Sequence, residues 1–201
     1  EEDILIDDII QSTKNKFQLS IQKVINATGI VIHTNLGRSK LSPNVQSELI
    51  DIAFGYSNLE YNLENGKRGS RYDHLVQIIK RLTGAEDALI VNNNAAAVLL
   101  VLNTIAKDGE VIVSRGELVE VGGSFRISSI MELGSGKLVE VGSTNKTHIE
   151  DYKSGFSEET KAIMKVHTSN YRILGFTESV GIEELKQQEE FKNIPIIEDL
   201  G

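Results

Sequence analysis

The sequence contains no cysteine, which excludes disulfide bonds, thiolate nucleophiles and cysteine-ligated metal centres. It has no apolar run near the roughly 20 residues that a membrane-spanning helix needs. Positive charge is scarce, because 21 Lys and Arg residues stand against 29 Asp and Glu residues, giving a net charge of −8. Such a surface does not indicate nucleic-acid binding. The acidic N-terminus is unlike a signal peptide, so we expect a cytoplasmic protein without a membrane partner.

Several well-known motifs are also missing from the sequence. There is no GxGxxG stretch and no GxSxG elbow, and Gly66-Lys67 lacks the upstream glycine and the following Ser or Thr of a phosphate-binding P-loop. The four histidines do not have the spacing of metal ligands on a helix. We therefore expect no metal site, and neither a P-loop nor a Rossmann nucleotide site.

The segment of residues 88–106 is the most informative part of the chain. Residues 88–91 form a short apolar run, typical of a buried strand, and three asparagines follow it. Residues 95–106 are apolar almost all the way round, which predicts a helix buried on every side. The start of such a helix carries free N–H groups and a positive dipole end, so Asn92, Asn93 and Asn94 form a candidate anion or phosphate site. The alternative is that Asn94 only caps the helix.

Strands and helices alternate along the rest of the chain. This order predicts an α/β fold with a mostly parallel sheet flanked by helices. We expect residues 55–71 to form a long irregular loop. The other predicted elements are named by their residue ranges. The predicted strands are 110–114, 137–141, 161–167 and 194–198, and the predicted helices are 43–54, 72–82, 121–131, 149–152 and 182–191.

In a parallel sheet the ligand lies beyond the carboxyl ends of the strands. His167 and Asp199 both follow predicted strands, as does the Asn92–Asn94 turn. An aspartate at a buried strand end is costly unless it meets a positive partner such as a protonated pyridine nitrogen. Taken together, a phosphate cradle, a ring contact and a buried aspartate predict a pyridoxal 5'-phosphate pocket. His167 is equally compatible with a structural hydrogen bond, and Asp199 with a turn or helix cap.

At this point the sequence resembles a known family, the bacterial L-seryl-tRNA(Sec) selenium transferases, or selenocysteine synthases. The resemblance extends from about residue 24 to residue 201. The matching stretches are INATGIVIHTNLGR at 25–38, NLEYNLENGKRGSR at 58–71, LTGAEDALIVNNNAAA at 82–97, VSRGELVE at 113–120, GSTNKT at 142–147, KVHTSNYR at 165–172 and EDLG at 198–201.

The resemblance implies the large domain of a fold-type-I pyridoxal-phosphate transferase of the aspartate aminotransferase type. It implies β-elimination of the seryl hydroxyl from seryl-tRNA(Sec) to give aminoacrylyl-tRNA, followed by addition of selenium from selenophosphate. By position, Asn92, Asn93 and Asn94 would bind the cofactor phosphate. His167 and Asn170 would contact the ring or its hydroxyl, and Asp199 the ring nitrogen. Arg38 and Arg71 match arginines expected around the anionic group of the selenium donor.

The resemblance also implies parts that these 201 residues do not contain. We expect residues 1–23 to be a helical arm or linker and residues 24–201 to be part of the cofactor-binding domain. An N-terminal tRNA-binding domain, the Schiff-base lysine beyond Asp199 and a C-terminal small domain would lie outside them. We expect a homo-oligomer built from dimers, and no activity from residues 1–201 alone. Two alternatives are a related lyase acting on a small sugar-acid phosphate and a non-catalytic fragment.

Overall fold

A computed structural model describes residues 2–118, 120–121, 125–133 and 136–201. The chain divides into two compact units, residues 1–69 and residues 70–201. The predicted boundary between residues 23 and 24 lies within the first of these units and stays a prediction.

The first unit contains short elements without a sheet of its own beyond one small hairpin. The predicted helix that starts at Ser42-Pro43 and ends at Phe54 is confirmed, and the Ser42 side chain caps its first turn by accepting from the Asn44 N–H at 3.3 Å. Its elements are α1 (Glu2–Phe17), η1 (Thr34–Leu36), η2 (Pro43–Val45), α2 (Gln46–Phe54) and the antiparallel pair β1 (Tyr61–Asn62) and β2 (Lys67–Arg68).

Two expectations for this part of the chain are wrong. Residues 55–71 are not wholly irregular, because the Asn62 and Asn65 side chains accept backbone N–H groups and close the β1–β2 hairpin. The apolar stripe of α2 is not buried, since Leu49 and Ile52 are both about half exposed or more. An amphipathic stripe is buried only where another element packs against it, and among the described residues of this unit the apolar side chains of α2 are left exposed.

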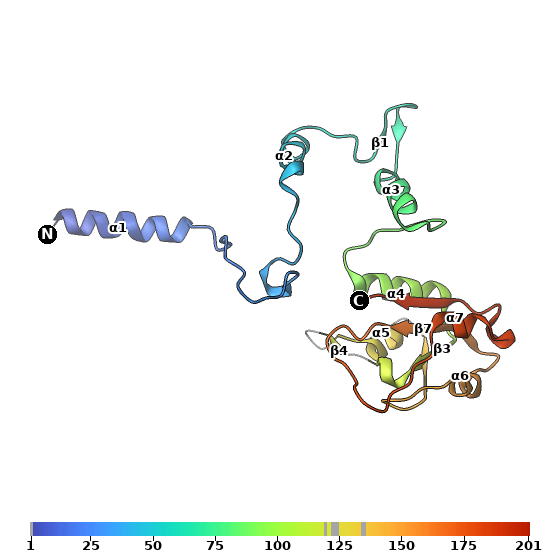
Figure 1. Ribbon diagram of the computed structural model, residues 1–201. Coiled ribbons are helices and arrows are strands. Elements are labelled where there is room, and N and C mark those ends of the chain that lie inside the picture. The colour runs from blue at the N-terminus through green and yellow to red at the C-terminus, as the bar shows by residue number, and fades with distance from the viewer. Residues whose placement is uncertain (1, 119, 122–124, 134–135) are drawn as a thin grey trace. The chain divides into compact units, whose positions relative to one another are not determined.

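The second unit is built on a four-stranded parallel sheet in the order β6-β3-β7-β8 (Figure 1). The α/β fold with a mostly parallel sheet flanked by helices is therefore confirmed. The two central strands, β3 and β7, pair in the register Val113 opposite Met164. The strands are β3 (Glu110–Ser114), β6 (Lys137–Val141), β7 (Thr160–Val166) and β8 (Ile196–Asp199), close to their predicted bounds.

Helices cover both faces of this sheet. The period-2 alternation of the central strands separates two apolar clusters, so that Val113 and Met164 face one cluster while Ile112 and Ile163 face the other. The first cluster is closed by α4 (Asn94–Ile105) and α5 (Ile127–Leu133). The second is closed by α6 (Ile149–Gly155), α7 (Ile182–Lys186) and η4 (Glu189–Phe191).

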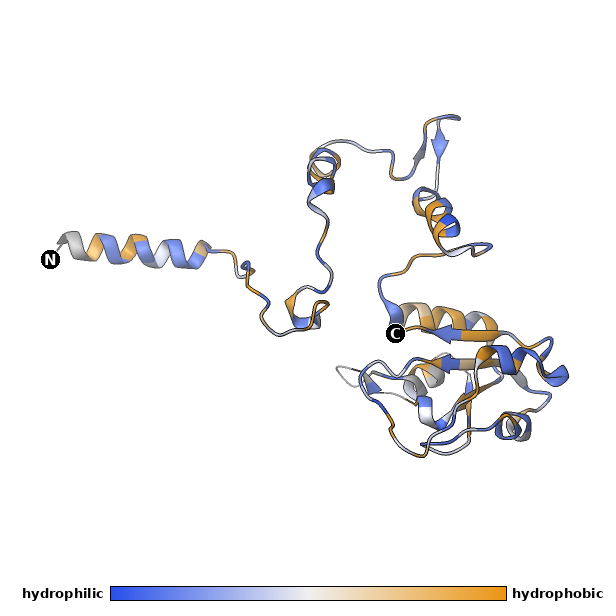
Figure 2. Cartoon of the chain, in the orientation of Figure 1, coloured by the Kyte–Doolittle hydropathy of each residue, from blue (hydrophilic) through white to orange (hydrophobic). Residues whose placement is uncertain are grey.

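The segment around α4 differs from its prediction in two ways. Residues 88–91 are not a strand, because none of the described strands pairs with them, and an apolar run needs a ladder partner to become one. The helix itself is confirmed and is hydrophobic along most of its length (Figure 2). It is buried on one side only: Leu102 is fully buried, while Leu100 is 41% exposed.

Two further helices were predicted from residues 72–82 and 121–131. The first is confirmed as α3 (Asp73–Thr83), which ends at Gly84 in the left-handed conformation with φ of 75°. Its apolar residues are not buried, since Leu75 is 46% exposed. The second prediction began too early, because β4 (Glu120–Val121) and β5 (Phe125–Arg126) pair antiparallel before α5 starts at Ile127. Residues 122–124, which the prediction included in this helix, fall outside the described residues.

Candidate functional site

The carboxyl ends of β3, β7 and β8 meet at one edge of the sheet, where the sequence predicted the ligand. An open pocket of about 490 Å³ lies at the ends of β3 and β7. Its lining is largely polar and includes Ser114, Glu117, Lys146, Thr147 and His167. The polar groups here come from the last residue of β3 and from the segments that follow the strands, which carry hydroxyl, amide and charged side chains.

The asparagine turn precedes α4, as predicted, but its residues differ in their contacts. Asn93, rather than Asn94, caps the helix, since its extended backbone (φ −165°) lets the side chain accept from the Ala96 N–H at 2.9 Å. Asn94 is the first helical residue, and Asn92 lies exposed in the bend before it. The N–H groups of the first turn remain at a positive dipole end, which suits an anion.

Asn94 and Asp199 meet in space although 105 residues separate them in sequence. Asn94 Nδ2 donates to Asp199 Oδ1 at 2.8 Å, and the backbone N–H of Gly201 donates to the same oxygen at 3.0 Å. Asp199 is only 8% exposed and has no ion-pair partner among the described residues. A buried carboxylate whose second oxygen lacks a cationic partner is suited to a positively charged ligand atom.

His167 and Asn170 lie on the segment that follows β7. The His167 backbone N–H donates to the Asp199 carbonyl at 2.9 Å, which joins this segment to the end of β8. Its exposed ring lies 3.2 Å from the Ser169 hydroxyl oxygen. Asn170 Nδ2 donates to the carbonyl of Glu120 at 3.0 Å. The structure thus brings Asn94, His167 and Asp199 to the same edge, with Asn170 three residues further along.

The two candidate arginines lie in different units. Arg38 belongs to the first unit and has a positive φ of 61° directly after Gly37, a backbone conformation that costs a non-glycine residue free energy. Arg71 belongs to the second unit and lies at the turn that opens α3.

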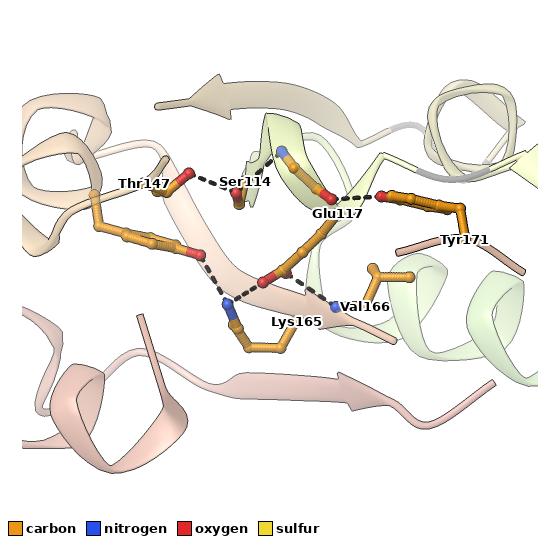
Figure 3. A network of polar contacts seen from close by, with 8 residues as sticks. Ser114, Glu117, Thr147, Lys165, Val166 and Tyr171 are labelled. Atoms are coloured by element: carbon orange, nitrogen blue, oxygen red, sulfur yellow. Dashed lines mark hydrogen bonds and ion pairs between the residues drawn. The ribbon is translucent and has the colours of Figure 1, made fainter. Parts of the chain in front are cut away.

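A buried ion pair lies beside the pocket and was not expected from the sequence (Figure 3). Glu117 of η3 (Arg115–Glu117) pairs with Lys165 of β7, and the side chain of each is only 12% exposed. The second carboxylate oxygen of Glu117 accepts the Val166 N–H at 3.1 Å. Lys165 Nζ also donates to the hydroxyl of Tyr152 at 3.2 Å. Both charges are therefore paired and hydrogen-bonded, as burial requires.

The tyrosines around this pair stay protonated. Burial raises the pKa of the Tyr152 hydroxyl, and the neighbouring carboxylates of Glu117 and Asp151 raise it further. Burial and Glu117 likewise raise the pKa of Tyr171, whose hydroxyl donates to the Gly116 carbonyl. These phenols therefore act here as neutral hydrogen-bonding groups and not as bases.

One feature of the sequence did point to this pair. Lys165 interrupts the apolar residues of β7, and a lysine in a central strand must either reach solvent or find an anion. Its partner lies 48 residues earlier, after β3, and only the pairing of β3 with β7 brings the two together. The 2.7 Å contact between the Ser114 and Thr147 hydroxyls also joins residues far apart in sequence, and here the pairing of β3 with β6 brings them together.

The fold is also that of a solved lyase. The chain is similar to the structure of a D-glucosaminate-6-phosphate ammonia-lyase, with a TM-score of 0.64 and 24% sequence identity over 84% of this chain and 46% of that one. At this level of identity the likeness establishes the shared fold.

The sequence gives a closer match. A family model described as SelA, L-seryl-tRNA selenium transferase, matches residues 24–201. The chain belongs to the L-seryl-tRNA selenium transferase family. Relatives named L-seryl-tRNA(Sec) selenium transferase are 59% identical in Alkaliphilus metalliredigens (strain QYMF) and 57% identical in Alkaliphilus oremlandii (strain OhILAs), over 97% and 98% of this chain.

The chain matches only part of the length of these selenium transferase relatives. The chain spans 42% of the length of each of the two Alkaliphilus proteins. None of the helices in the described ranges is long and apolar enough to cross a membrane. Within the same ranges, His, Asp and Glu residues form no group of three or more suited to a metal ion.

Proposed function

We propose that the full-length protein converts seryl-tRNA(Sec) to selenocysteyl-tRNA(Sec) with selenophosphate as the selenium donor and pyridoxal 5'-phosphate as the cofactor. It would act in the cytoplasm as a homo-oligomer built from dimers. Family membership supports the reaction class. The single structural observation that carries the proposal is the 2.8 Å contact between Asn94 and Asp199, which joins a helix start suited to an anion to a buried carboxylate.

The residues at this edge fit the cofactor's two charged ends. The first turn of α4, with the amide groups of Asn92, Asn93 and Asn94, would hold its phosphate. Asp199, buried and without a cationic partner among the described residues, would hold the protonated ring nitrogen. When bound, pyridoxal phosphate supplies an electron sink for removal of the seryl α-proton and loss of the β-hydroxyl.

The chain's own residues would orient the cofactor and keep the ring nitrogen charged. Asn94 Nδ2 and the Gly201 N–H fix the Asp199 carboxylate by donating to the same oxygen, Oδ1. The other oxygen, Oδ2, accepts neither bond and would face the ring nitrogen. His167 would cover the ring and Asn170 would contact its hydroxyl, since both follow β7 at the same edge. The lysine that holds the cofactor would come from outside these 201 residues.

We further propose that Arg38 and Arg71 bind the anionic group of the selenium donor. A guanidinium suits a phosphate-like oxyanion because its planar fork forms paired, charge-assisted hydrogen bonds. Changing Arg71 to alanine in the full-length protein is expected to lower selenium transfer at least about tenfold, since a charge-assisted bond contributes about 1.5–3 kcal/mol. Transfer of labelled selenium to tRNA, measured over a range of selenophosphate concentrations, tests this.

The matched control for Arg71 is Arg68, three residues earlier. Its side chain is 84% exposed and pairs with Glu60 at 3.0 Å on the surface of the hairpin. Arg68→Ala is expected to transfer selenium as the unchanged protein does. Equal activity of both variants, each with an unaltered circular dichroism spectrum, would rule out the role proposed for Arg71.

The function itself is tested with the full-length protein and two substrates. Seryl-tRNA(Sec) with labelled selenophosphate is expected to give acid-precipitable selenium, recovered as selenocysteine after deacylation. D-glucosaminate 6-phosphate, offered to the same preparation, is expected to release no ammonia. The converse result would favour the sugar-acid lyase, which shares the fold. Loss of both activities in a protein that binds the cofactor would contradict both.

A further inference from the structure

Four side-chain contacts join residues 116, 117 and 120, which follow β3, to the end of β7 and to the segment after it. Two of these contacts reach Lys165 and Val166 of β7, and two come from Asn170 and Tyr171 beyond the strand. Figure 3 shows three of these contacts: the Glu117–Lys165 ion pair, the bond from the Val166 N–H to Glu117 Oε2, and the bond from the Tyr171 hydroxyl to the Gly116 carbonyl. The fourth is the bond from Asn170 Nδ2 to the Glu120 carbonyl.

Glu117 extends the sheet beyond the point where β3 ends. The β3–β7 register runs to Val113 opposite Met164. In a parallel pair, alternate N–H groups face the same neighbouring strand, so the next N–H of β7 directed to β3 belongs to Val166. That N–H donates to Glu117 Oε2 at 3.1 Å. The carboxylate therefore takes the acceptor place of a strand carbonyl.

The position of His167 depends on this contact. Val166 and His167 are adjacent, and their N–H groups donate to acceptors on two different segments. The Val166 N–H donates to Glu117, and the His167 N–H donates to the Asp199 carbonyl at 2.9 Å. Tyr171 and Asn170 hold the far end of the segment against the same turn. The segment 167–170 is thus held on both sides by contacts to residues 116, 117 and 120.

The ion pair that carries this contact is buried and cannot be broken at low cost. The Glu117 and Lys165 side chains are each 12% exposed, and Tyr152 closes the far side of the ammonium, with Nζ 5.6 Å from its ring centroid. Removing one partner of such a pair leaves the other charge buried and unpaired. By contrast, the nearby Arg115–Glu140 pair is 48% and 42% exposed, so its loss is compensated by water.

We propose that Glu117 is a positioning residue. It sets the position and orientation of the His167–Asn170 segment at the edge of the sheet where the cofactor is proposed to bind, an inference that rests on the proposed function. Glu117 acts through Lys165 and Val166 and does not itself touch the cofactor. Tyr171 has the same effect through the Gly116 carbonyl, with one neutral hydrogen bond in place of a buried charge.

The test uses the full-length protein with Glu117→Gln, and Tyr171→Phe as a second, milder variant that folds even if the first does not. Glu117→Gln is expected to weaken pyridoxal phosphate binding about tenfold or more, since it removes a charge-assisted contact. Hydrogen exchange is expected to rise more in residues 166–171 than in residues 110–114, where any rise reports only the general loss of stability. Tyr171→Phe is expected to change both quantities in the same direction but less.

Glu140→Gln is the matched control, because it removes the exposed ion pair of the same turn and is expected to change neither quantity. A merely destabilising effect would raise exchange throughout β3 and β7 and leave the cofactor affinity of the folded protein intact, which would overturn the inference. Unchanged local exchange in both variants would also overturn it. If the unchanged protein bound no cofactor, the proposed function would fail, while the exchange data would still decide the role of Glu117.

Discussion

Exchange of the seryl α-proton is expected to slow about 10- to 100-fold when Asp199 is changed to alanine in the full-length protein. A hydrogen bond to a charged group contributes about 1.5–3 kcal/mol, and each 1.36 kcal/mol corresponds to a factor of ten in rate. In the proposed site Asp199 would keep the ring nitrogen of the cofactor protonated, and its removal would favour the neutral pyridine, which withdraws electrons less strongly. Incubating seryl-tRNA in deuterated water and following deuterium at the α-carbon by mass spectrometry measures this step without selenium.

Glu198, the preceding residue of β8, provides the control for Asp199. It is an exposed carboxylate on the same strand, so Glu198→Ala removes the same charge from the opposite face of the sheet. This variant is expected to exchange the α-proton at the unchanged rate. Normal exchange by the Asp199 variant, with cofactor bound, would mean that another group holds the ring nitrogen.

The largest effect on stability is expected at Leu102. Its side chain is fully buried against the sheet in the cluster that contains Val98, Val111 and Met164. Leu102→Ala is expected to destabilise the second unit by about 2–5 kcal/mol, because the change removes apolar contacts and leaves a cavity. Native-state hydrogen exchange of the amides in β3 and β7 reports this unit within the larger protein, whose unfolding need not be two-state.

Leu100 lies on the same helix and is the matched comparison. It is 41% exposed, and alanine is the best helix former, so Leu100→Ala is expected to cost less than about 1 kcal/mol. The pair also separates two descriptions of α4. Equal costs at Leu100 and Leu102 would mean that α4 is buried on every side in the full-length protein, as its sequence predicted.

Most of the sheet was predictable because its strands are short apolar runs bounded by polar residues. The runs that became β3, β6, β7 and β8 each find a partner within residues 110–199. The run at residues 88–91 has the same composition but no partner among the described strands. The composition of a run does not say whether another strand will pair with it. The β4–β5 hairpin was missed because two-residue strands leave no measurable periodicity.

The candidate site was predictable to the extent that residues mark strand ends. His167 and Asp199 lie at the carboxyl ends of β7 and β8, and the parallel order places such residues at one edge. Asn94 meets the same edge as the first residue of α4, although the apolar run before it is not a strand. It was not predictable that Asn93, and not Asn94, caps α4. Either residue can cap a helix, and only the extended φ of Asn93 decides which one does. Glu117 was missed because its importance comes from a partner 48 residues away in sequence.

The alternation along β7 has a consequence for how the chain folds. Ala162, Met164 and Val166 face one cluster, whereas Ile163 and Lys165 face the other. A slip of β7 by one residue would turn every side chain over and place the Lys165 ammonium among the apolar side chains under α4, without an anion. Parallel strands are joined by long crossovers and assemble slowly, which gives such mispairing time to occur. We therefore expect the Lys165–Glu117 pair to favour the native strand register during folding, because a mispaired sheet that buries the ammonium without its carboxylate is unstable.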